Sequence, residues 1–226
     1  MHEIFQHLIS AHALQSWEST LYLRFTFLSQ AVFLAVATAA EVCNMVVCII
    51  DNGAGKIKAG VCRHPNSIDD LLQLKHTNCT ARVIKQMNIL VADEVDNCFN
   101  GSLLQYNRPF DRGYLVNWQC ETEVWSRLFG SAGLNITPSE SSLCVTDAPF
   151  TPEILQNDMN EVVFEEYNFL EYLRKPSAWF SAYQFASNNP ENTQNATCCT
   201  VIDSGFSFTH TMPFLNGKCQ KSAVRL

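Results

Sequence analysis

The sequence predicts an α/β fold, because strand-like apolar runs alternate with segments of helical periodicity. Apolar residues make up 47% of the 226 residues and charged residues 16%, which is ample material for a hydrophobic core. The formal net charge of −7 argues against the basic surface of a protein that binds nucleic acid directly. That charge still allows a role in a nucleic-acid complex through other proteins.

Residues 1–44 are expected to lie outside the working fold. The run FTFLSQAVFLAVATAA at 25–40 is apolar but shorter than the ~20 residues that a membrane-spanning helix needs. Its end resembles a signal-peptide cleavage site, whereas Glu3 and Glu18 stand where a signal peptide carries positive charge. Met45 heads the first convincing strand. We therefore expect a start near Met45, with a signal or anchor and a helix of unknown role as the alternatives.

The beginning of the fold is predicted to be rich in strands. Apolar runs at 45–50 and 56–62, separated by turn signals at 51–55, predict a strand–turn–strand unit. Residues 63–80 are polar and irregular, which indicates a loop and a sheet edge. The sequence NILVADEV at 88–95 returns to an apolar strand.

A first helix is predicted after turn signals and a short strand at 106–118. Asn117 can cap this helix and Gly130 can end it. Its apolar face would consist of Val124, Trp125, Leu128 and Phe129.

A second helix is predicted after the apolar strand at 141–150. Thr151 would cap it, with Pro152 at its first position. Its inner face would consist of Leu155, Met159, Val162 and Val163. Residues 188–195 read as a polar linker, and CCTVID at 198–203 predicts a further strand.

Two turns along the chain share one design. CIIDNGAGKIK at 48–58 and TVIDSGFSFTH at 200–210 each place Asp, a small polar residue and Gly after an apolar strand. Each also has a basic or titratable group, Lys58 or His210, seven residues after the Asp. One such turn alone is an ordinary hairpin. Two copies in matching context favour a shared function.

Paired hairpins of this kind can hold phosphate groups. Consecutive backbone N–H groups in a tight turn suit phosphate oxygens, and glycine lets the backbone approach closely. Asp51 and Asp203 could hold hydrated Mg²⁺, which keeps several waters and takes one or two carboxylates. Lys58 would bring its ammonium near the phosphates. No G-x-x-x-x-G-K-[ST] phosphate loop occurs, so the predicted clamp is built from hairpins.

Residues 45–226 resemble the N-terminal half of actin and the actin-related proteins. The likeness rests on the segments DNGAGKIKAG, RPFDRGYLVNW, EVWSRLFG, LCVTDAPFTPEILQNDMNEVVFEEYNF and CCTVIDSGFSFTH. It implies an actin-like ATPase fold, in which two α/β lobes of the ribonuclease-H-like type face each other with ATP or ADP and magnesium between them. The fold is expected to be truncated, with the first lobe at 45–195 and an incomplete second lobe beginning at 196–226.

The resemblance assigns nucleotide-phosphate roles to residues of both turns. The first loop corresponds to Asp51, Asn52, Gly53, Ala54, Gly55 and Lys58, and the second to Asp203, Ser204, Gly205, Ser207 and His210. Asp51 and Asp203 would bind magnesium through water.

Three departures from actin make ATP hydrolysis unexpected. Phe206 stands where actin has an aspartate, so it supplies no magnesium ligand. Ser207 replaces a glycine, which would cost about 1–2 kcal/mol if the position needs left-handed φ. Pro176 and Ser177 fall near the glutamine that positions the attacking water. The expected site is therefore a degenerate ATP-binding site without a catalytic residue.

Within the family, the motifs resemble most the actin-related proteins of nuclear SWR/SRCAP-type chromatin-remodelling complexes, which exchange a variant histone into nucleosomes. This implies a non-catalytic scaffold subunit, partnered by a zinc-HIT-type protein and a motor ATPase subunit, that contacts the nucleosome indirectly. The expected location is the nucleus, with the cytoplasm as an alternative. Neither a membrane nor a filament is expected among its contacts.

Two other functions stay open. The clamp also suits an ATPase of the actin superfamily or a cytoskeletal actin-like protein. Ten cysteines and four N-x-[ST] triplets would suit a secreted, disulfide-bonded glycoprotein. The alternative reading of the cysteines is a set of reduced, buried thiols.

Overall fold

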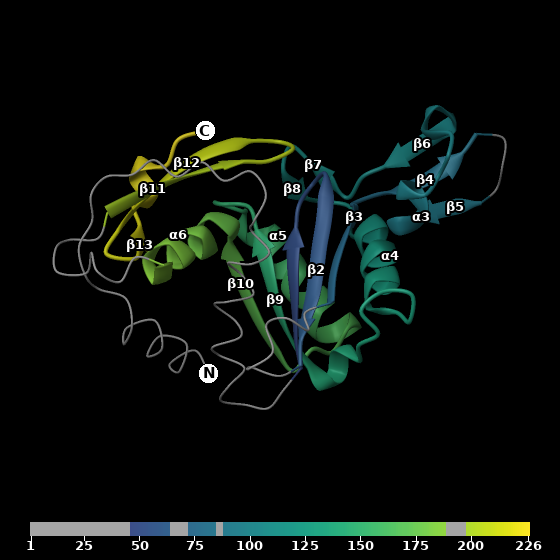
Figure 1. Cartoon of the computed structure of the whole chain (residues 1–226), viewed down its shortest axis with the longest axis horizontal. Helices are drawn as coiled ribbons and strands as arrows, with labels where there is room; N and C mark the ends of the chain where they lie inside the picture. Colours follow the sequence, from purple (N-terminus) through teal and green to yellow (C-terminus); the bar gives the residue numbers. More distant parts are fainter. Residues whose placement is uncertain (1–45, 64–71, 85–87, 189–197) are drawn as a thin grey trace.

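The computed structural model of the chain describes residues 46–63, 72–84, 88–188 and 198–226 (Figure 1). The expectations for residues 1–44, for Met45 and for the boundary between residues 195 and 196 lie outside the described residues. No helix in the described part is long and apolar enough to cross a membrane.

A five-stranded sheet forms the centre of the molecule, in the order β10-β9-β1-β2-β3 (Figure 1). Its strands are β1 (Val46–Asn52), β2 (Lys56–Cys62), β3 (Leu72–Thr77), β9 (Ser141–Asp147) and β10 (Glu171–Pro176). β1, β2 and β3 pair antiparallel, whereas β1, β9 and β10 run parallel. The parallel pairs require crossovers, and helices supply them. The predicted α/β class is therefore confirmed.

Helices cover both faces of this sheet, and successive side chains of β1 point to opposite faces, so each face has its own core. Cys48 and Ile50 belong to the larger core, which packs against α4 (Trp118–Phe129) and α5 (Glu153–Glu161). The alternate residues Val47 and Ile49 pack against Phe180 of α6. α6 spans Ser177–Asn188, and α5 continues into a π-helix, η4, at Val162–Glu166.

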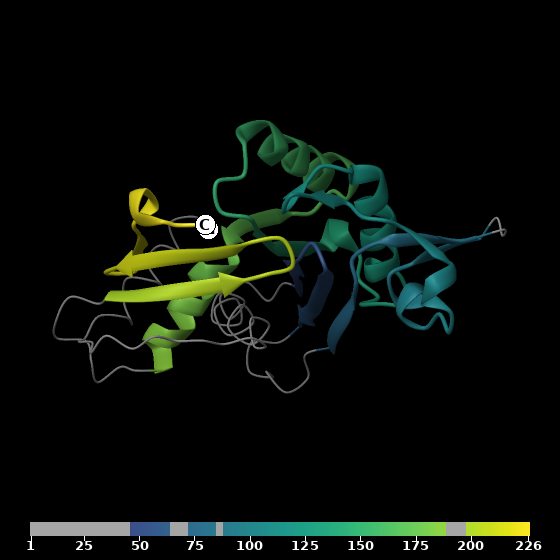
Figure 2. The ribbon, with the colours of Figure 1, turned by 90° about the horizontal axis from the view of Figure 1, so that it is seen from above.

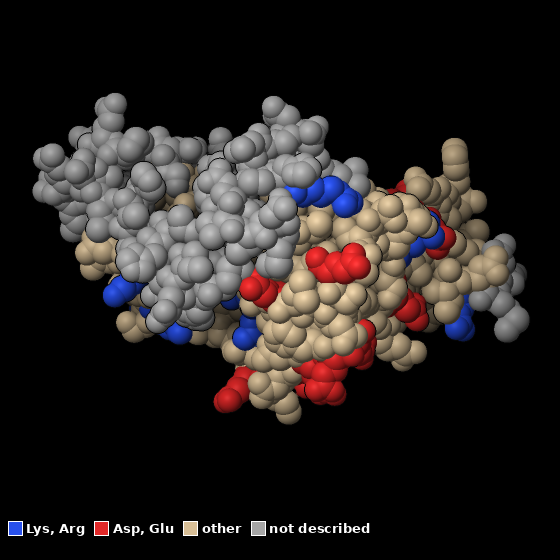
Figure 3. All heavy atoms as spheres, turned by 90° about the horizontal axis from the view of Figure 1, so that it is seen from below, with Lys and Arg blue, Asp and Glu red and all other residues tan. Residues whose placement is uncertain are grey.

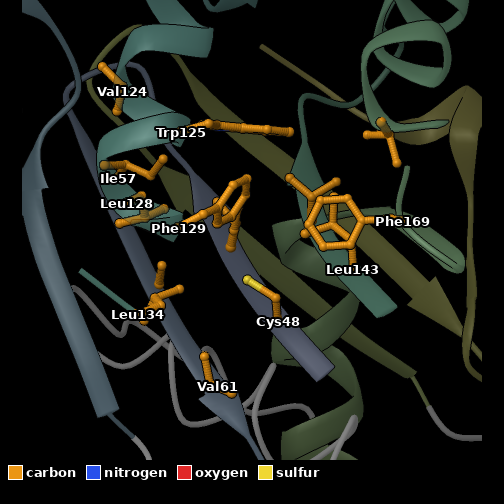
Figure 4. Packing of buried hydrophobic residues seen from close by; sticks show 14 of the residues in the cluster. Cys48, Ile57, Val61, Val124, Trp125, Leu128, Phe129, Leu134, Leu143 and Phe169 are labelled. Carbon is orange, nitrogen blue, oxygen red and sulfur yellow. The ribbon is translucent and has the colours of Figure 1, made fainter. Parts of the chain in front are cut away.

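The larger core is centred on aromatic side chains of α4 (Figure 4). Trp125 is fully buried and contacts Phe129 edge-on, with ring centroids 5.8 Å apart. The residues of the predicted apolar face of α4 are all buried, namely Val124, Trp125, Leu128 and Phe129. Asn117 Oδ1 accepts a hydrogen bond from Cys120 N at 3.2 Å, so the predicted cap is confirmed. Gly130 follows as the C-cap.

The predicted start of the second helix was wrong. α5 begins at Glu153, Pro152 takes the capping position, and no side chain caps the helix. The hydroxyl of Thr151 turns back instead and donates to Asp147 Oδ1 and to Ala148 O, both at 2.9 Å. On the predicted inner face of this helix, Leu155 is half-buried, and Met159, Val162 and Val163 are buried.

The strand predicted at 88–95 is also shorter than expected. β5 covers only Ile89–Val91 and is followed by a short helix, α3, at Asp93–Asp96. Ala92 has a positive φ of 48°, and Glu94 Oε2 accepts a hydrogen bond from Val91 N. The acidic residues after the apolar run therefore turn the chain rather than extend the strand.

The region predicted as loop and edge, 63–80, contains one strand, β3, and the next strand begins at its last residue. β3 is the edge of the central sheet, and β4 (Thr80–Val83) is the middle of a small sheet in the order β5-β4-β6. β6 spans Leu104–Asn107 and follows the short helix η2 (Gly101–Leu103). The small sheet and α3 form one end of the molecule (Figure 1).

The last described residues form a separate sheet at the opposite end. β11 (Cys198–Ser204), β12 (Thr209–Leu215) and β13 (Lys218–Cys219) lie in that order, followed by η6 at Lys221–Ala223. Met212 and Phe214 of β12 pack against Ala178 and Ala182 of α6. Figure 2 shows the β11–β12 hairpin beside α6, with its turn directed towards the tip of β1–β2. Two short strands, β7 (Phe110–Asp111) and β8 (Tyr114–Leu115), lie next to that turn (Figure 1).

Candidate functional site

The two hairpins have the same strand register. In β1–β2, Asp51 lies opposite Lys58. In β11–β12, Asp203 lies opposite His210. The seven-residue spacing in the sequence is thus a cross-strand pair in both hairpins, with four residues between the last paired positions.

Both hairpins border one cavity of about 360 Å³. The residues for which the resemblance implied phosphate contacts all line it, namely Asp51, Asn52, Gly53, Ala54, Gly55, Lys58, Asp203, Ser204, Gly205, Ser207 and His210. The cavity is also lined by the end of β9 and by α6. The fold therefore brings together two segments that lie about 150 residues apart in the sequence.

The carboxylate of the first hairpin is held by two neighbours. Asp51 Oδ2 accepts a hydrogen bond from Lys58 Nζ at 2.5 Å, and Asp51 Oδ1 accepts one from Thr146 Oγ1 at 2.8 Å. Thr146 Oγ1 also accepts a hydrogen bond from Asn52 N at 2.9 Å. The Lys58 side chain is about one third exposed. Its ammonium can therefore contact an anion in the cavity while it is paired with Asp51.

The carboxylate of the second hairpin is held in a similar way. Asp203 Oδ2 accepts a short hydrogen bond from the hydroxyl of Ser177, the first residue of α6. Burial lowers the pKa of the facing His210, and the Asp203 carboxylate only partly offsets this. His210 is therefore mainly neutral at physiological pH.

Phe206 connects the two turns. A Cβ atom on Gly55 would lie 2.8 Å from Phe206 Cδ2, so the ring packs directly against the first turn. Arg108 stacks over that ring, with its guanidinium carbon 4.9 Å from the centroid, and its Nη1 lies 3.4 Å from Ala54 O. Ser207 is not among the residues with positive φ, so the strain considered for serine does not arise.

The sequence analysis missed the residues at the end of β9. Thr146 and Asp147 line the cavity because β9 runs parallel to β1, so both strands end at the same edge of the sheet. Asp147 lies 3.6 Å from the Arg174 guanidinium and accepts a hydrogen bond from Ala148 N. Burial nevertheless raises its pKa. The TD pair at the end of an apolar run was the signal that could have identified them.

A buried carboxyl, Glu121 of α4, also escaped the sequence analysis. Burial raises its pKa to about 7, although the nearby N–H groups of Asn52, Asn78 and Trp125 lower it. Both oxygens of this carboxyl lack a hydrogen-bond partner among the described residues. Asn78 Nδ2 donates to Asn52 Oδ1 at 3.3 Å and lies 3.2 Å from Gly53 O. The buried carboxyl thus lies beside the side-chain amides that hold the first turn.

The chain is similar in sequence to known proteins of one family. The sequence model of the family described as Actin matches residues 43–226. The chain is 38% identical over 172 residues to actin-like protein ARP6 of Cryptococcus neoformans. This match covers 76% of this chain and 34% of that protein. It is 35% identical over 184 residues to actin-related protein 6 of Neurospora crassa, covering 78% and 41%, respectively. For actin-related protein 6 of Arabidopsis thaliana the values are 34% over 183 residues, covering 79% and 42%.

The chain spans about two fifths of the length of the curated relatives it matches. The resemblance that the quoted motifs indicated, to the N-terminal part of actin-related proteins, is confirmed by these matches. The actin-like fold is confirmed with it. Because the family match covers most of its residues, the chain belongs to the actin family.

Proposed function

We propose that this chain is a non-catalytic scaffold whose two hairpins hold the phosphates of ATP or ADP. The observation that carries the proposal is that both hairpins border the same cavity, which Asp51 and Asp203 both line. Its volume of about 360 Å³ lies within the range of small-ligand sites. Membership of the actin family suggests nucleotide binding in general.

The residues present fit a phosphate group. Lys58 supplies a cation at the cavity, and Gly53 lets the turn close, since a Cβ there would lie 2.7 Å from Lys56 O. In the described segments no three His, Cys, Asp or Glu side chains converge as metal ligands. Magnesium would therefore be held through water by Asp51 and Asp203. A bound nucleotide would add negative charge that Lys58 can neutralise across the cleft.

Two contacts favour binding without hydrolysis. Phe206 places an apolar ring against the first turn, where it offers no ligand to a metal or a water. The Ser177 hydroxyl donates to Asp203 and is therefore committed to holding the second hairpin. The alternative, an ATPase, is favoured by His210, because a neutral imidazole facing the cavity can accept a proton.

The nucleotide proposal is tested by titrating the full chain with a fluorescent ATP analogue and magnesium, and by following phosphate release. We expect saturable binding, about tenfold weaker in Lys58→Met. Lys218→Met, which removes an exposed lysine of β13, should leave the affinity unchanged. Absence of binding to the wild-type chain at millimolar nucleotide contradicts the proposal. Phosphate release that disappears in Asp203→Ala would establish the ATPase alternative.

For the cellular role, we propose a subunit of a nuclear SWR/SRCAP-type chromatin-remodelling complex that exchanges a histone variant. The support is the likeness to relatives named actin-related protein 6. The proposed partners are a zinc-HIT-type protein and the motor ATPase subunit, with indirect contact to the nucleosome and none to membranes or filaments. Co-expression of the chain with these two subunits tests this: co-purification as one particle is expected. A chain that stays separate from both and outside the nucleus would contradict it.

A further inference from the structure

The outer face of α5 and η4 exposes several large apolar side chains. Ile154 is 70% exposed, Phe150 just before the helix is 56% exposed, and Phe164 is 46% exposed. Single exposed apolar residues are ordinary, but these three lie within one segment of fifteen residues, just before α5, in α5 and in η4. We call these three residues, together with the exposed acids described next, the α5–η4 face.

The same segment is strongly acidic. Residues 150–166 contain five carboxylates and no Lys, Arg or His. Four of the acids are exposed, namely Glu153, Glu161, Glu165 and Glu166. Arg174 does not neutralise them, because its guanidinium lies against Asp147 and donates to Gln156 Oε1. Figure 3 shows acidic side chains gathered at the lower edge of that view.

The backbone of this face departs from regular geometry at both ends. Phe150 has a φ of 63°, which is rare for a bulky residue and costs about 1–3 kcal/mol. Residues 162–166 form a π-helix, a rare conformation that is frequent at functional sites. Phe150 stands at one end of the face and Phe164 within the π-helix, so both irregular segments present aromatic rings to solvent. Irregular backbone of this kind is enriched at functional sites.

We propose that the α5–η4 face binds a basic amphipathic helix of a partner protein. Lys and Arg side chains of the partner would lie against Glu161 and Glu165, and its apolar stripe would cover Ile154 and Phe164. α5 and η4 together have fourteen residues, and at about 1.5 Å per residue they match a partner helix of about four turns. The negative charge disfavours nucleic acids and anionic membranes as occupants. This inference is independent of nucleotide binding.

The test uses the full chain and a labelled synthetic peptide of about 18 residues with Lys and Leu in amphipathic helical order. Fluorescence anisotropy should report saturable binding that weakens as salt is added. We expect about tenfold weaker binding for Ile154→Ser and for the double change Glu161→Lys with Glu165→Lys. A scrambled peptide of the same composition should bind at least tenfold more weakly than the amphipathic one.

Matched controls distinguish this face from general stickiness. Phe99→Ser and Glu123→Lys change an exposed aromatic and an exposed acid elsewhere on the surface, and should leave the affinity unchanged. Thermal melting of every variant checks that the fold persists. Equal losses in the controls, equal binding of the scrambled peptide, or self-association through Ile154 that excludes the peptide would each overturn the proposal. Tighter binding to DNA or to phosphatidylserine vesicles than to the peptide would overturn it as well.

Discussion

The first hairpin, β1–β2, lies in the centre of a five-stranded sheet, whereas the second, β11–β12, belongs to a three-stranded sheet at one end of the molecule. Ile50, just before Asp51, is fully buried, but Ile202, just before Asp203, is only half-buried. Both hairpins keep the same register, and in both the Asp carboxylate accepts a hydrogen bond from a hydroxyl on another element. The local sequence therefore determines the register of each hairpin, whereas the burial of its strands by the rest of the fold determines how stable the hairpin is.

The largest expected effect separates the hairpins by their burial. Ile50→Ala removes a fully buried side chain and should lower the free energy of unfolding by about 2–5 kcal/mol. Ile202→Ala, at the matching position, should cost about 1 kcal/mol or less, because the site is partly solvated. Urea unfolding followed by circular dichroism measures both. Equal costs would mean that the second hairpin is as firmly packed as the first.

The second prediction concerns the buried acid beneath the first hairpin, which has no described counterpart among the buried residues under the second. The pKa of Glu121 is raised from 4.5 to about 7, so the folded protein binds more protons than the unfolded chain between these values. Its contribution to stability is therefore complete below pH 4.5 and lost as pH rises to about 7. The loss is at most about 3 kcal/mol.

Glu121→Gln should remove this dependence and make the protein more stable than wild type at pH 8. The measurement is the difference in free energy of unfolding between the two proteins from pH 5 to pH 8, which cancels contributions from other groups. Glu123→Gln, an exposed change on the same helix, serves as the control. A difference that stays constant with pH would show that the Glu121 carboxyl is solvated.

What the sequence could predict depends on how far apart the interacting residues are. The apolar face of α4 follows from periodicity, and it was confirmed. The seven-residue spacing was visible in the sequence, but the structure was needed to show that it places Asp51 opposite Lys58 and Asp203 opposite His210. The Thr146 contact to Asp51 depends on a parallel pairing between segments 95 residues apart, which no local pattern encodes.

Two further misses have a different cause. Glu121 lies on the buried stripe of α4, where a charged residue is normally read as exposed. Its burial becomes evident only once α4 is packed behind the first turn. Thr151 was read as a cap from its type alone, and the Asp147 carboxylate, brought near by the fold, took its hydroxyl instead.

The smallest predicted effect measures the contact between the two hairpins. Gly55→Ala should have two opposing effects: it restricts the unfolded chain, which stabilises by about 0.4–1 kcal/mol, and it brings a Cβ within 2.8 Å of the Phe206 ring. Phe206 is 69% exposed, so its ring can move aside at modest cost. In the Phe206→Ala background only the stabilising effect remains. A double-mutant cycle should therefore give a coupling of about 0.5–1 kcal/mol.

The control for this cycle is Gly101→Ala, because a Cβ there would meet only Tyr106 Oη, at 3.4 Å, and no atom of Phe206 within 4 Å. Its effect should add to that of Phe206→Ala without coupling. Additivity at Gly55 as well would mean that the turns do not touch in solution, and that the cleft is wider than the structure shows. A measurable coupling, in contrast, would establish that the two hairpins are held together by Phe206 even without a nucleotide, because no phosphate is needed to bring that ring against Gly55.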